Sequence, residues 1–317
     1  MVRYFEKQKK GALQELENLT QGCWVNISPP FNAVEIDQLA EQLDVPIDFL
    51  TDPLDIDERT RFEIEDDVKF IVVNTPALNE AGRDDLTLYI TIPIGIIITT
   101  ENIVTISSYE TAVMQKFIES KVRSFNPQDF SLFVLQILEQ NVYTYLRCLK
   151  DINVRRNIIE KEVYESSQNK DLKRLLSLEK SLVYFVTALS SNALLKQKLQ
   201  RMDLLSIQKD EEKADLLEDI MIDNSQAQEM AHIYTNILSN TMGALASMIS
   251  NNLNEVMQRL TLITIILMVP TLVASFYGMN VNDLPLQKSP YAFWFLLGGS
   301  MLFSFSLVIF FRSKRMI

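Results

Sequence analysis

Two long uncharged segments near the C-terminus constrain this 317-residue chain more than any other feature. Residues 260–276 are almost wholly apolar, and residues 291–311 carry no charged side chain. Each segment, as a helix rising about 1.5 Å per residue, is long enough to cross a hydrocarbon layer of about 30 Å. Only residues 277–290 separate them, which suffices for a tight turn. The sequence therefore predicts a hairpin in the lipid bilayer, carried at the C-terminal end of a large water-soluble body.

The charges beside the two spans predict how the hairpin is oriented. Arg259 precedes the first span and the basic tail 312–317 follows the second, whereas the turn between them has Lys288 offset by Asp283. Basic residues close to a span favour the cytoplasmic side. Residues 1–20 are charged and show no signal peptide. We therefore expect a multi-pass protein of the cell (inner) membrane with both termini in the cytoplasm.

The net charge of −11 is concentrated in the water-soluble body. Residues 251–317 contain five bases and two acids, so the other 25 bases and 39 acids lie in residues 1–250. An acidic body is unsuited to nucleic acid. Cys23 and Cys148 are expected to stay reduced in the cytoplasm, and the single His232 cannot complete a Ser-His-Asp triad. With no Gly-rich phosphate loop or nucleophile motif, neither an enzyme nor an organic cofactor is expected.

Residues 1–126 read as a cytoplasmic α/β domain, a mixed sheet flanked by helices. Segments rich in β-branched residues are typical of strands, and Asn32 is a favourable cap for a following helix. Strands are expected at 68–73, 86–92 and 96–106, the last interrupted by a turn at 101–102, and further helices after Asn32 and at 111–120.

From residue 128 to residue 269 the chain has no proline and only one glycine, Gly243. Its composition favours helix. Residues 127–205 are expected to hold an antiparallel pair, 130–165 and 171–202, and residues 206–278 a long stalk helix that becomes the first transmembrane helix at about 258–278. An external loop (279–290), the second transmembrane helix (291–311) and the tail (312–317) complete the predicted domains. A helix on the order of 100 Å long needs bundling, which indicates an oligomer.

Polar and thioether side chains of the first span recur at steps of three and four, on one face of a helix. They are Asn254, Met257, Thr261, Thr264, Met268, Thr271 and Ser275. Such a stripe can be packing contact between helices, or it can line a pore formed by several copies. Seven positions in register favour the pore. Its lumen would be uncharged and would suit a hydrated ion such as Mg²⁺, and Met257, Leu260 and Met268 could constrict it.

The end of the first span adds a specific motif, Tyr277-Gly278-Met279-Asn280. It follows Asn254-Glu255-Val256-Met257, Leu260-Thr261, Met268 and Pro270-Thr271. Together with the second span and the basic tail, these residues resemble the CorA-type divalent-cation channels, whose signature is Gly-Met-Asn at the end of the first of two C-terminal spans.

This resemblance implies a funnel-shaped homopentamer in which the first spans surround the pore. Asn280 of each subunit would bind hydrated Mg²⁺ at the outer mouth, with Gly278 and Met279 shaping the selectivity filter. The pore lining and gate would include Asn254, Met257, Leu260, Met268 and Thr271. Mg²⁺ would be both the transported and the regulatory ion.

The resemblance also implies that cytoplasmic Mg²⁺ bridges acids of neighbouring subunits and holds the channel shut. Asp219 on the long helix and Asp52 in Leu50-Thr51-Asp52-Pro53-Leu54 match the family positions. Further candidates nearby are Glu218, Asp215, Asp223, Asp55 and Asp57. Two carboxylates across a seam repel until a divalent ion neutralises them; any one of these acids taken alone can equally be ordinary surface charge.

Three functions are compatible with the sequence. The first is Mg²⁺ influx, with Co²⁺ or Ni²⁺ as secondary ions. The second is Zn²⁺ transport on the same scaffold, because the outer turn has Asp283 as its only acid, near Lys288. The third is a membrane-tethered sensor without a pore, which the polar stripe disfavours.

Overall fold

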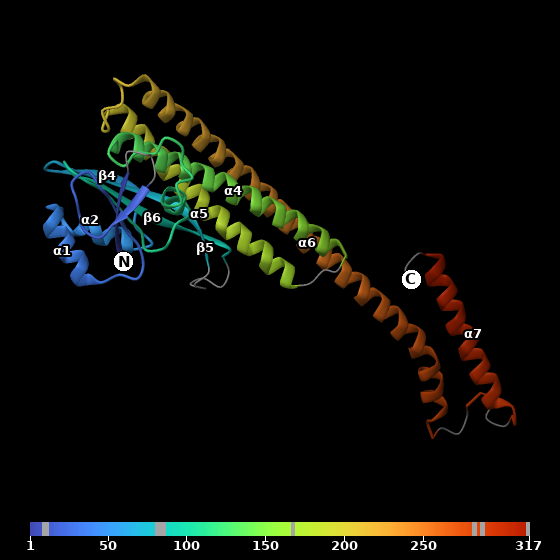
Figure 1. Ribbon diagram of the computed structural model, residues 1–317. Helices are drawn as coiled ribbons and strands as arrows, with labels where there is room; N and C mark the ends of the chain where they lie inside the picture. The colour runs from blue at the N-terminus through green and yellow to red at the C-terminus, as the bar shows by residue number, and fades with distance from the viewer. Residues whose placement is uncertain (8–12, 80–86, 166–168, 281–283, 286–288, 315–317) are drawn as a thin grey trace. The chain divides into compact units, whose positions relative to one another are not determined.

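The computed structural model describes residues 1–7, 13–79, 87–165, 169–280, 284–285 and 289–314. Its residues group into two compact units, Met1–Met242 and Gly243–Ile317. The long helix α6 (Glu211–Tyr277) contributes residues to both (Figure 1). The domain boundaries inferred from the sequence remain predictions.

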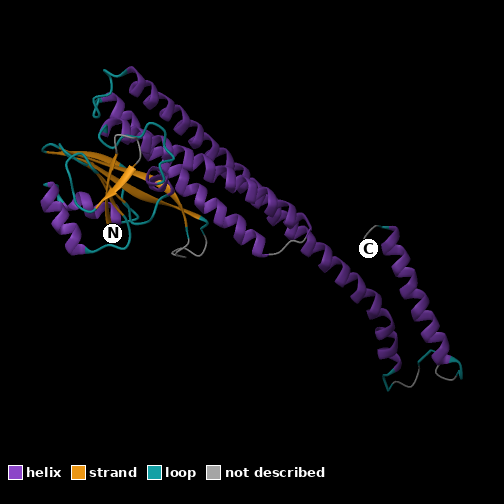
Figure 2. Cartoon of the chain, in the orientation of Figure 1, coloured by secondary structure: helices purple, strands orange, loops and turns teal. Residues whose placement is uncertain are grey.

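The first unit contains one mixed sheet and most of the helices (Figure 2). The described strands are β1 (Val2–Lys7), β2 (Leu13–Leu16), β3 (Trp24–Ile27), β4 (Arg61–Glu65), β5 (Val68–Leu78), β6 (Tyr89–Ile98) and β7 (Ile103–Ile106). The other described helices are α1 (Ala33–Leu43), α2 (Ile47–Thr51), the 3-10 helix η1 (Asp52–Leu54), α3 (Ala112–Ile118), α4 (Phe130–Glu165), α5 (Asn169–Arg201) and, in the second unit, α7 (Ala292–Ser313).

The sheet has the order β2-β1-β3-β7-β6-β5-β4, in which only β3 and β7 pair in parallel. Both faces are covered, because successive side chains of a strand point to opposite sides. In β5, Ile71 and Val73 belong to the core under α3, α4, α5 and the start of α6. Phe70 and Val72 belong to the core under α1 and α2. The first unit is therefore three layers, helix, sheet and helix.

The 3-10 helix η1 packs closely against the face of the sheet that α1 and α2 cover. Gly95 of β6 is required there, since a Cβ atom at this position would collide with Pro53. Leu54 packs against the same core as α1 and α2. The 3-10 helix η1, which begins with Asp52, is thereby held on the face of the sheet opposite the start of α6.

The long helices α4, α5 and α6 lie alongside one another (Figure 1). The buried positions of α5 alternate between steps of three and four, the spacing of coiled-coil seams. The buried residues that follow this spacing are Leu175, Leu178, Leu182, Phe185, Leu189, Asn192, Lys196 and Leu199. On α6 the corresponding buried residues are Leu217, Ile220, Asn224, Ala227 and Ala231.

Asn192 fastens this bundle to the sheet. β4 pairs with β5 only as far as Val72, and the amide of Asn192 then contacts the backbone of Asn74. It accepts from the Asn74 N–H at 3.2 Å and donates to the Asn74 carbonyl at 2.8 Å. Asn141 and Tyr145 of α4 donate to the same carbonyl. The half-buried backbone of Asn74, where the β4–β5 pairing ends, is thus satisfied by side chains.

Most expected elements are present. The helix at 130–165 coincides with α4, and Asn32 caps α1 by accepting from the Val34 N–H. The expected turn at 101–102 lies between β6 and β7. One expectation was wrong: the strands predicted at 86–92 and from 96 are a single strand, β6, which continues through Pro93 and Gly95. Residue 86 lies outside the described residues.

Candidate functional site

Two described helices are long and apolar enough to cross a membrane, the C-terminal part of α6 and α7. They coincide with the two predicted spans. Within the second unit they touch along one face of each helix. On α6 the residues shielded on that face are Leu262, Ile266, Val269, Val273 and Tyr277. On α7 Ser300 and Ser304 are the buried residues.

A hydrogen bond joins the two helices where α6 contains a proline. Pro270 has no N–H, so it leaves the carbonyl of Ile266 without its helical donor. The hydroxyl of Ser304 donates to this carbonyl at 3.1 Å. The α6–α7 contact therefore repairs the defect that Pro270 introduces.

The polar stripe lies on a different face of α6 from this contact. At about 100° per residue, the stripe points roughly opposite to Leu262 and Ile266. Met257, Leu260 and Met268 are 54%, 57% and 54% exposed, whereas Leu262 is 4% exposed. The remaining stripe residues, Asn254, Thr261, Thr264, Thr271 and Ser275, are also exposed. The stripe is therefore not a seam between the two spans of one chain.

Three threonines of the stripe use their hydroxyl protons within the helix. Thr261, Thr264 and Thr271 donate to the carbonyls of the residues four positions earlier, at 2.8, 2.8 and 2.9 Å. A hydroxyl has one donor and two acceptor lone pairs. With the proton committed to the helix, the oxygen presents only acceptors to the exposed face.

The helix ends at the predicted motif. The Gly278 N–H donates to the carbonyls of Ala274 and Ser275, at 2.9 and 3.2 Å. Tyr277 is half-buried and donates its hydroxyl to the Pro285 carbonyl. Met279 and Asn280 are exposed after the helix end. Asp283 and Lys288 of the outer turn, which keep Zn²⁺ transport open as an alternative, lie outside the described residues.

In the first unit, Asp52 is held by a neighbouring arginine. Arg61 contacts Asp52 at 2.6 Å, and it also pairs with Glu58 and Glu63. Burial opposes the charge of Arg61, but these carboxylates outweigh it and its pKa is raised. Asp52 is thus a partly exposed carboxylate that forms an ion pair with Arg61.

The predicted acids on α6 lie near Tyr143 of α4. Burial raises the pKa of Tyr143, and so do Glu139, Asp223 and Asp219. Asp215, Glu218 and Asp219 are exposed and Asp223 is half-buried.

The structure does not bring Asp52 and Asp219 together in one chain. Asp52 follows α2 on one face of the sheet, and Leu217 and Ile220, beside Asp219, pack in the core of the other face. Among the described residues, no three His, Cys, Asp or Glu side chains form a group that could hold a metal ion.

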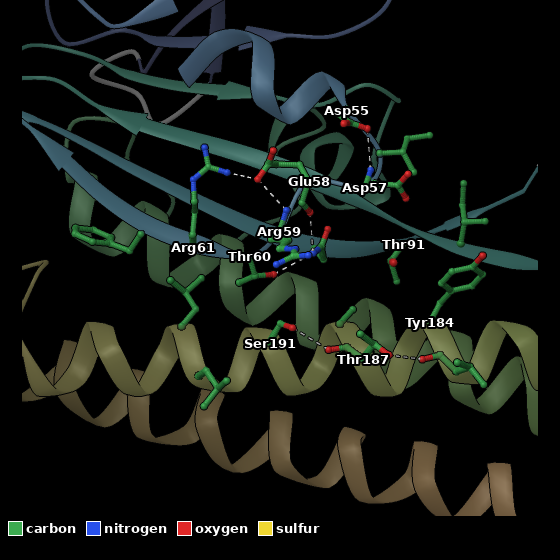
Figure 3. A pocket seen from close by; sticks show the side chains of 18 of the residues that line it. Asp55, Asp57, Glu58, Arg59, Thr60, Arg61, Thr91, Tyr184, Thr187 and Ser191 are labelled. Atoms are coloured by element: carbon green, nitrogen blue, oxygen red, sulfur yellow. Dashed lines mark hydrogen bonds and ion pairs between the residues drawn. The ribbon is translucent and has the colours of Figure 1, made fainter. Parts of the chain in front are cut away.

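Asp55 and Asp57 line a groove of about 920 Å³ between the loop before β4 and α5. The Asp57 N–H donates to the Asp55 side chain at 3.1 Å. Arg59 and Lys198 line the same groove, so it carries both signs of charge. Figure 3 shows this loop, with Asp55, Asp57 and Glu58, above the α5 residues Tyr184, Thr187 and Ser191.

Sequence reasoning missed two partners of the site. The presence of Pro270 could have predicted a polar partner such as Ser304 on the second span, because a proline in a span leaves one carbonyl that a neighbour must satisfy. No sequence signal marked Arg61 as the partner of Asp52, since a turn and a strand edge bring them together.

The fold and the site define a two-span membrane protein with an uncovered polar face on its first span. The family model described as "CorA-like Mg2+ transporter protein" matches residues 20–315. The cobalt/magnesium transport protein CorA of Methanocaldococcus jannaschii is 26% identical over 294 residues, covering 91% of this chain and 89% of that protein. The chain belongs to the CorA-like Mg²⁺ transporter family.

Two solved structures show the same fold. The complete CorA magnesium transporter from Methanocaldococcus jannaschii has a TM-score of 0.78 at 24% identity, over 98% of this chain and 97% of that one. The ZntB cytoplasmic domain from Vibrio parahaemolyticus has a TM-score of 0.58 at 13% identity, over 80% and 98%. The predicted fold class, a mixed-sheet domain followed by long helices and a C-terminal helix pair, is confirmed.

Proposed function

We propose that five identical copies of this chain form a channel for Mg²⁺ influx across the cell membrane, with Co²⁺ and Ni²⁺ as secondary ions and both termini in the cytoplasm. Family membership supports a transporter rather than an enzyme. The observation that carries the proposal is the polar stripe, which α7 leaves uncovered. Polar groups inside a bilayer, here the acceptor lone pairs of the threonine hydroxyls, usually face a helix interface or water, and a lumen shared by several copies provides water.

The orientation of the hydroxyls suits a hydrated cation. Water bound to a cation turns its hydrogens outward, so a wall that holds the hydrated ion needs acceptors. The oxygens of Thr261, Thr264 and Thr271 are such acceptors, because their protons are committed to helix carbonyls. Mg²⁺ loses its water reluctantly and is handled through its hydration shell. An uncharged wall of acceptors therefore favours Mg²⁺ with its water retained.

Asn280, exposed beyond the end of α6, is assigned to the ring at the outer mouth. Its amide carbonyl adds further acceptors, and Gly278 and Met279 set the turn that presents it. Met257, Leu260 and Met268 are exposed on the stripe face and would narrow the lumen with apolar groups, which can close a pore by excluding water.

Regulation by cytoplasmic Mg²⁺ is assigned to Asp52 and Asp219. Carboxylate oxygens are suitable ligands for Mg²⁺. Within one chain they lie on opposite faces of the sheet, so a shared ion requires Asp219 from a second copy. Glu218, Asp215, Asp223, Asp55 and Asp57 are candidates to complete the site.

Zn²⁺ transport is the second candidate. The likeness to the ZntB cytoplasmic domain supports the scaffold alone, and the outer turn has a single acid, Asp283. Uptake of Mg²⁺ and of Zn²⁺ into liposomes, with and without a proton gradient, separates the two. Mg²⁺ uptake that needs no proton gradient supports the channel, and Zn²⁺ uptake that requires one supports the alternative.

The variant Asn280→Ala tests the pore itself. Ion uptake should be lost, because the ring of acceptors is removed. Asn251→Ala, an exposed asparagine before the stripe, is the matched control and should keep its uptake. Flux that is unchanged in Asn280→Ala would remove Asn280 from the ion pathway, and a wild-type protein that carries no flux would support a tethered sensor instead. The mass of the complex in detergent should be that of a pentamer, and a monomer would exclude a shared pore.

The variant Asp219→Lys tests the regulatory assignment. Wild-type protein should be protected from protease by Mg²⁺, and this protection should be lost in the variant because a cation replaces a ligand. Glu229→Lys, an exposed acid further along α6, should retain protection. Equal protection of Asp219→Lys and wild type would remove Asp219 from the site.

A further inference from the structure

Lys196 of α5 is a lysine with no exposed surface. It occupies the seam position between Asn192 and Leu199, where apolar residues are expected. Its amine donates to the Asn224 side-chain oxygen of α6 at 2.5 Å. Asn224 in turn donates to the Leu189 carbonyl at 3.2 Å. The amine is therefore enclosed between two long helices and held by one neutral acceptor.

No carboxylate pairs with this amine among the described residues, and burial lowers its pKa. On α6, Asp219 and Asp223 act on Tyr143 instead. On α5, the exposed Lys198 donates to the Phe62 carbonyl. On α4, Glu139 accepts from Tyr143, and the buried Tyr145 donates to the Asn74 carbonyl.

Burying an ammonium group without a counter-ion is costly, so the neutral form is favoured. Burial lowers the pKa of Lys196 to about 7. The amine is consequently neutral in the packed state on the alkaline side of neutrality. In water it would take up a proton, because an exposed lysine has a pKa of about 10.4.

We propose that the Lys196–Asn224 contact is a proton-operated latch between α5 and α6, which holds while the amine is neutral and loosens when a proton drives the amine into water. The proton comes from the surrounding water. Because α6 also carries the polar stripe, the latch links the packing of the first unit to the helix of the first span. This proposal does not depend on which ion the spans transport.

The sign of the pH dependence follows from the lowered pKa of Lys196. Between pH 7 and about 10 the opened state binds one proton more than the packed state, so opening becomes up to about tenfold more frequent for each unit by which the pH falls. Below pH 7 both states are protonated and the dependence ends. A polar residue that only fixes helix register would give no such dependence.

Acetylation of the full-length protein, read out lysine by lysine with mass spectrometry, tests whether the buried amine is neutral. An exposed lysine becomes about tenfold more reactive per pH unit between pH 8 and 10, because only the neutral amine reacts. Lys196, already neutral and reacting only through brief openings, should have a constant rate over this range. Exposed Lys209 is the control. A tenfold rise per unit at Lys196 would overturn the proposal.

Hydrogen exchange of the α5–α6 amides tests whether protonation opens the contact. The ratio of exchange in wild type to that in Lys196→Met removes the intrinsic effect of pH. This ratio should rise by up to about tenfold per unit from pH 9 to pH 7 and then level off. Lys198→Met, which removes an exposed lysine two residues away, should behave as wild type. A ratio that does not change with pH would show a purely structural lysine and overturn the latch.

Discussion

The hydroxyl of Ser304 donates to the carbonyl of Ile266 at 3.1 Å, and this is the carbonyl that Pro270 leaves without a helical donor. In hydrocarbon, water cannot take over an unsatisfied carbonyl. The proline in the first span is therefore tolerated because the second span supplies the missing hydrogen bond.

Ser304→Ala should weaken the α6–α7 contact by about 0.6 to 1.7 kcal/mol, the range found for hydrogen bonds between membrane helices. Resistance to unfolding in detergent measures the effect. Ser306→Ala, exposed on the same helix, should be neutral. In a Pro270→Ala background the helix regains its own donor, so Ser304→Ala should cost less. An equal cost in both backgrounds would separate the serine from the proline.

Arg61 competes with any metal ion for Asp52, because it lies 2.6 Å from that carboxylate. Partly exposed ion pairs are worth roughly 0.2 to 1 kcal/mol. Arg61→Gln should therefore lower the Mg²⁺ concentration that gives half-maximal protection from protease, by up to about fivefold. Arg59→Gln, an exposed neighbour, controls for the general loss of a positive charge. If the half-maximal concentration stays the same or rises, Asp52 is not a ligand.

Asp129 joins the start of α4 to the start of α6 through Lys213 at 2.8 Å. Burial alone would raise the pKa of Asp129, but the hydrogen bonds from Lys213, the Leu132 N–H and Ser131 outweigh it and hold the pKa below its usual value. A lowered carboxyl pKa stabilises the fold above about pH 4, and this contribution disappears as the pH falls through the folded-state value.

Asp129→Asn should therefore unfold at a lower temperature than wild type at pH 7, and the difference should shrink at pH 3. Thermal unfolding of the full chain in detergent measures both. Asp37→Asn, an exposed aspartate of α1, should change little at either pH. A difference that persists undiminished at pH 3 would contradict the role of the charge.

The sequence predicts secondary structure best where local residue preference and periodicity agree. Helix α4 coincides with its predicted range because residues 128–269 contain no proline and a single glycine. The short strands β1 to β4 were not foreseen individually. Trp24–Ile27 is buried at every position, so it shows no alternation, and β6 continues through a proline and a glycine that normally interrupt strands.

For the site, the spacing of the stripe was predictable, since it depends on helix geometry alone. What covers each face depends on tertiary contacts. The Ser304–Ile266 bond joins residues 38 apart, and the Asp52–Arg61 pair depends on how η1 seats against Gly95. The buried position of Lys196 follows a visible seam spacing, but its partner Asn224 lies on another helix.

Water accessibility of two adjacent positions on α6 tests the shared lumen most directly. Ser275 belongs to the stripe and Ala274 lies about 100° away; both are exposed in the single chain and tolerate cysteine with little change in size. The native Cys23 and Cys148 are buried. A membrane-impermeant thiol reagent added outside should react with Ser275→Cys and block Mg²⁺ uptake, and should leave Ala274→Cys unmodified and active. Equal reaction at both positions, or reaction at Ala274→Cys alone, would contradict a water-filled pathway along the stripe.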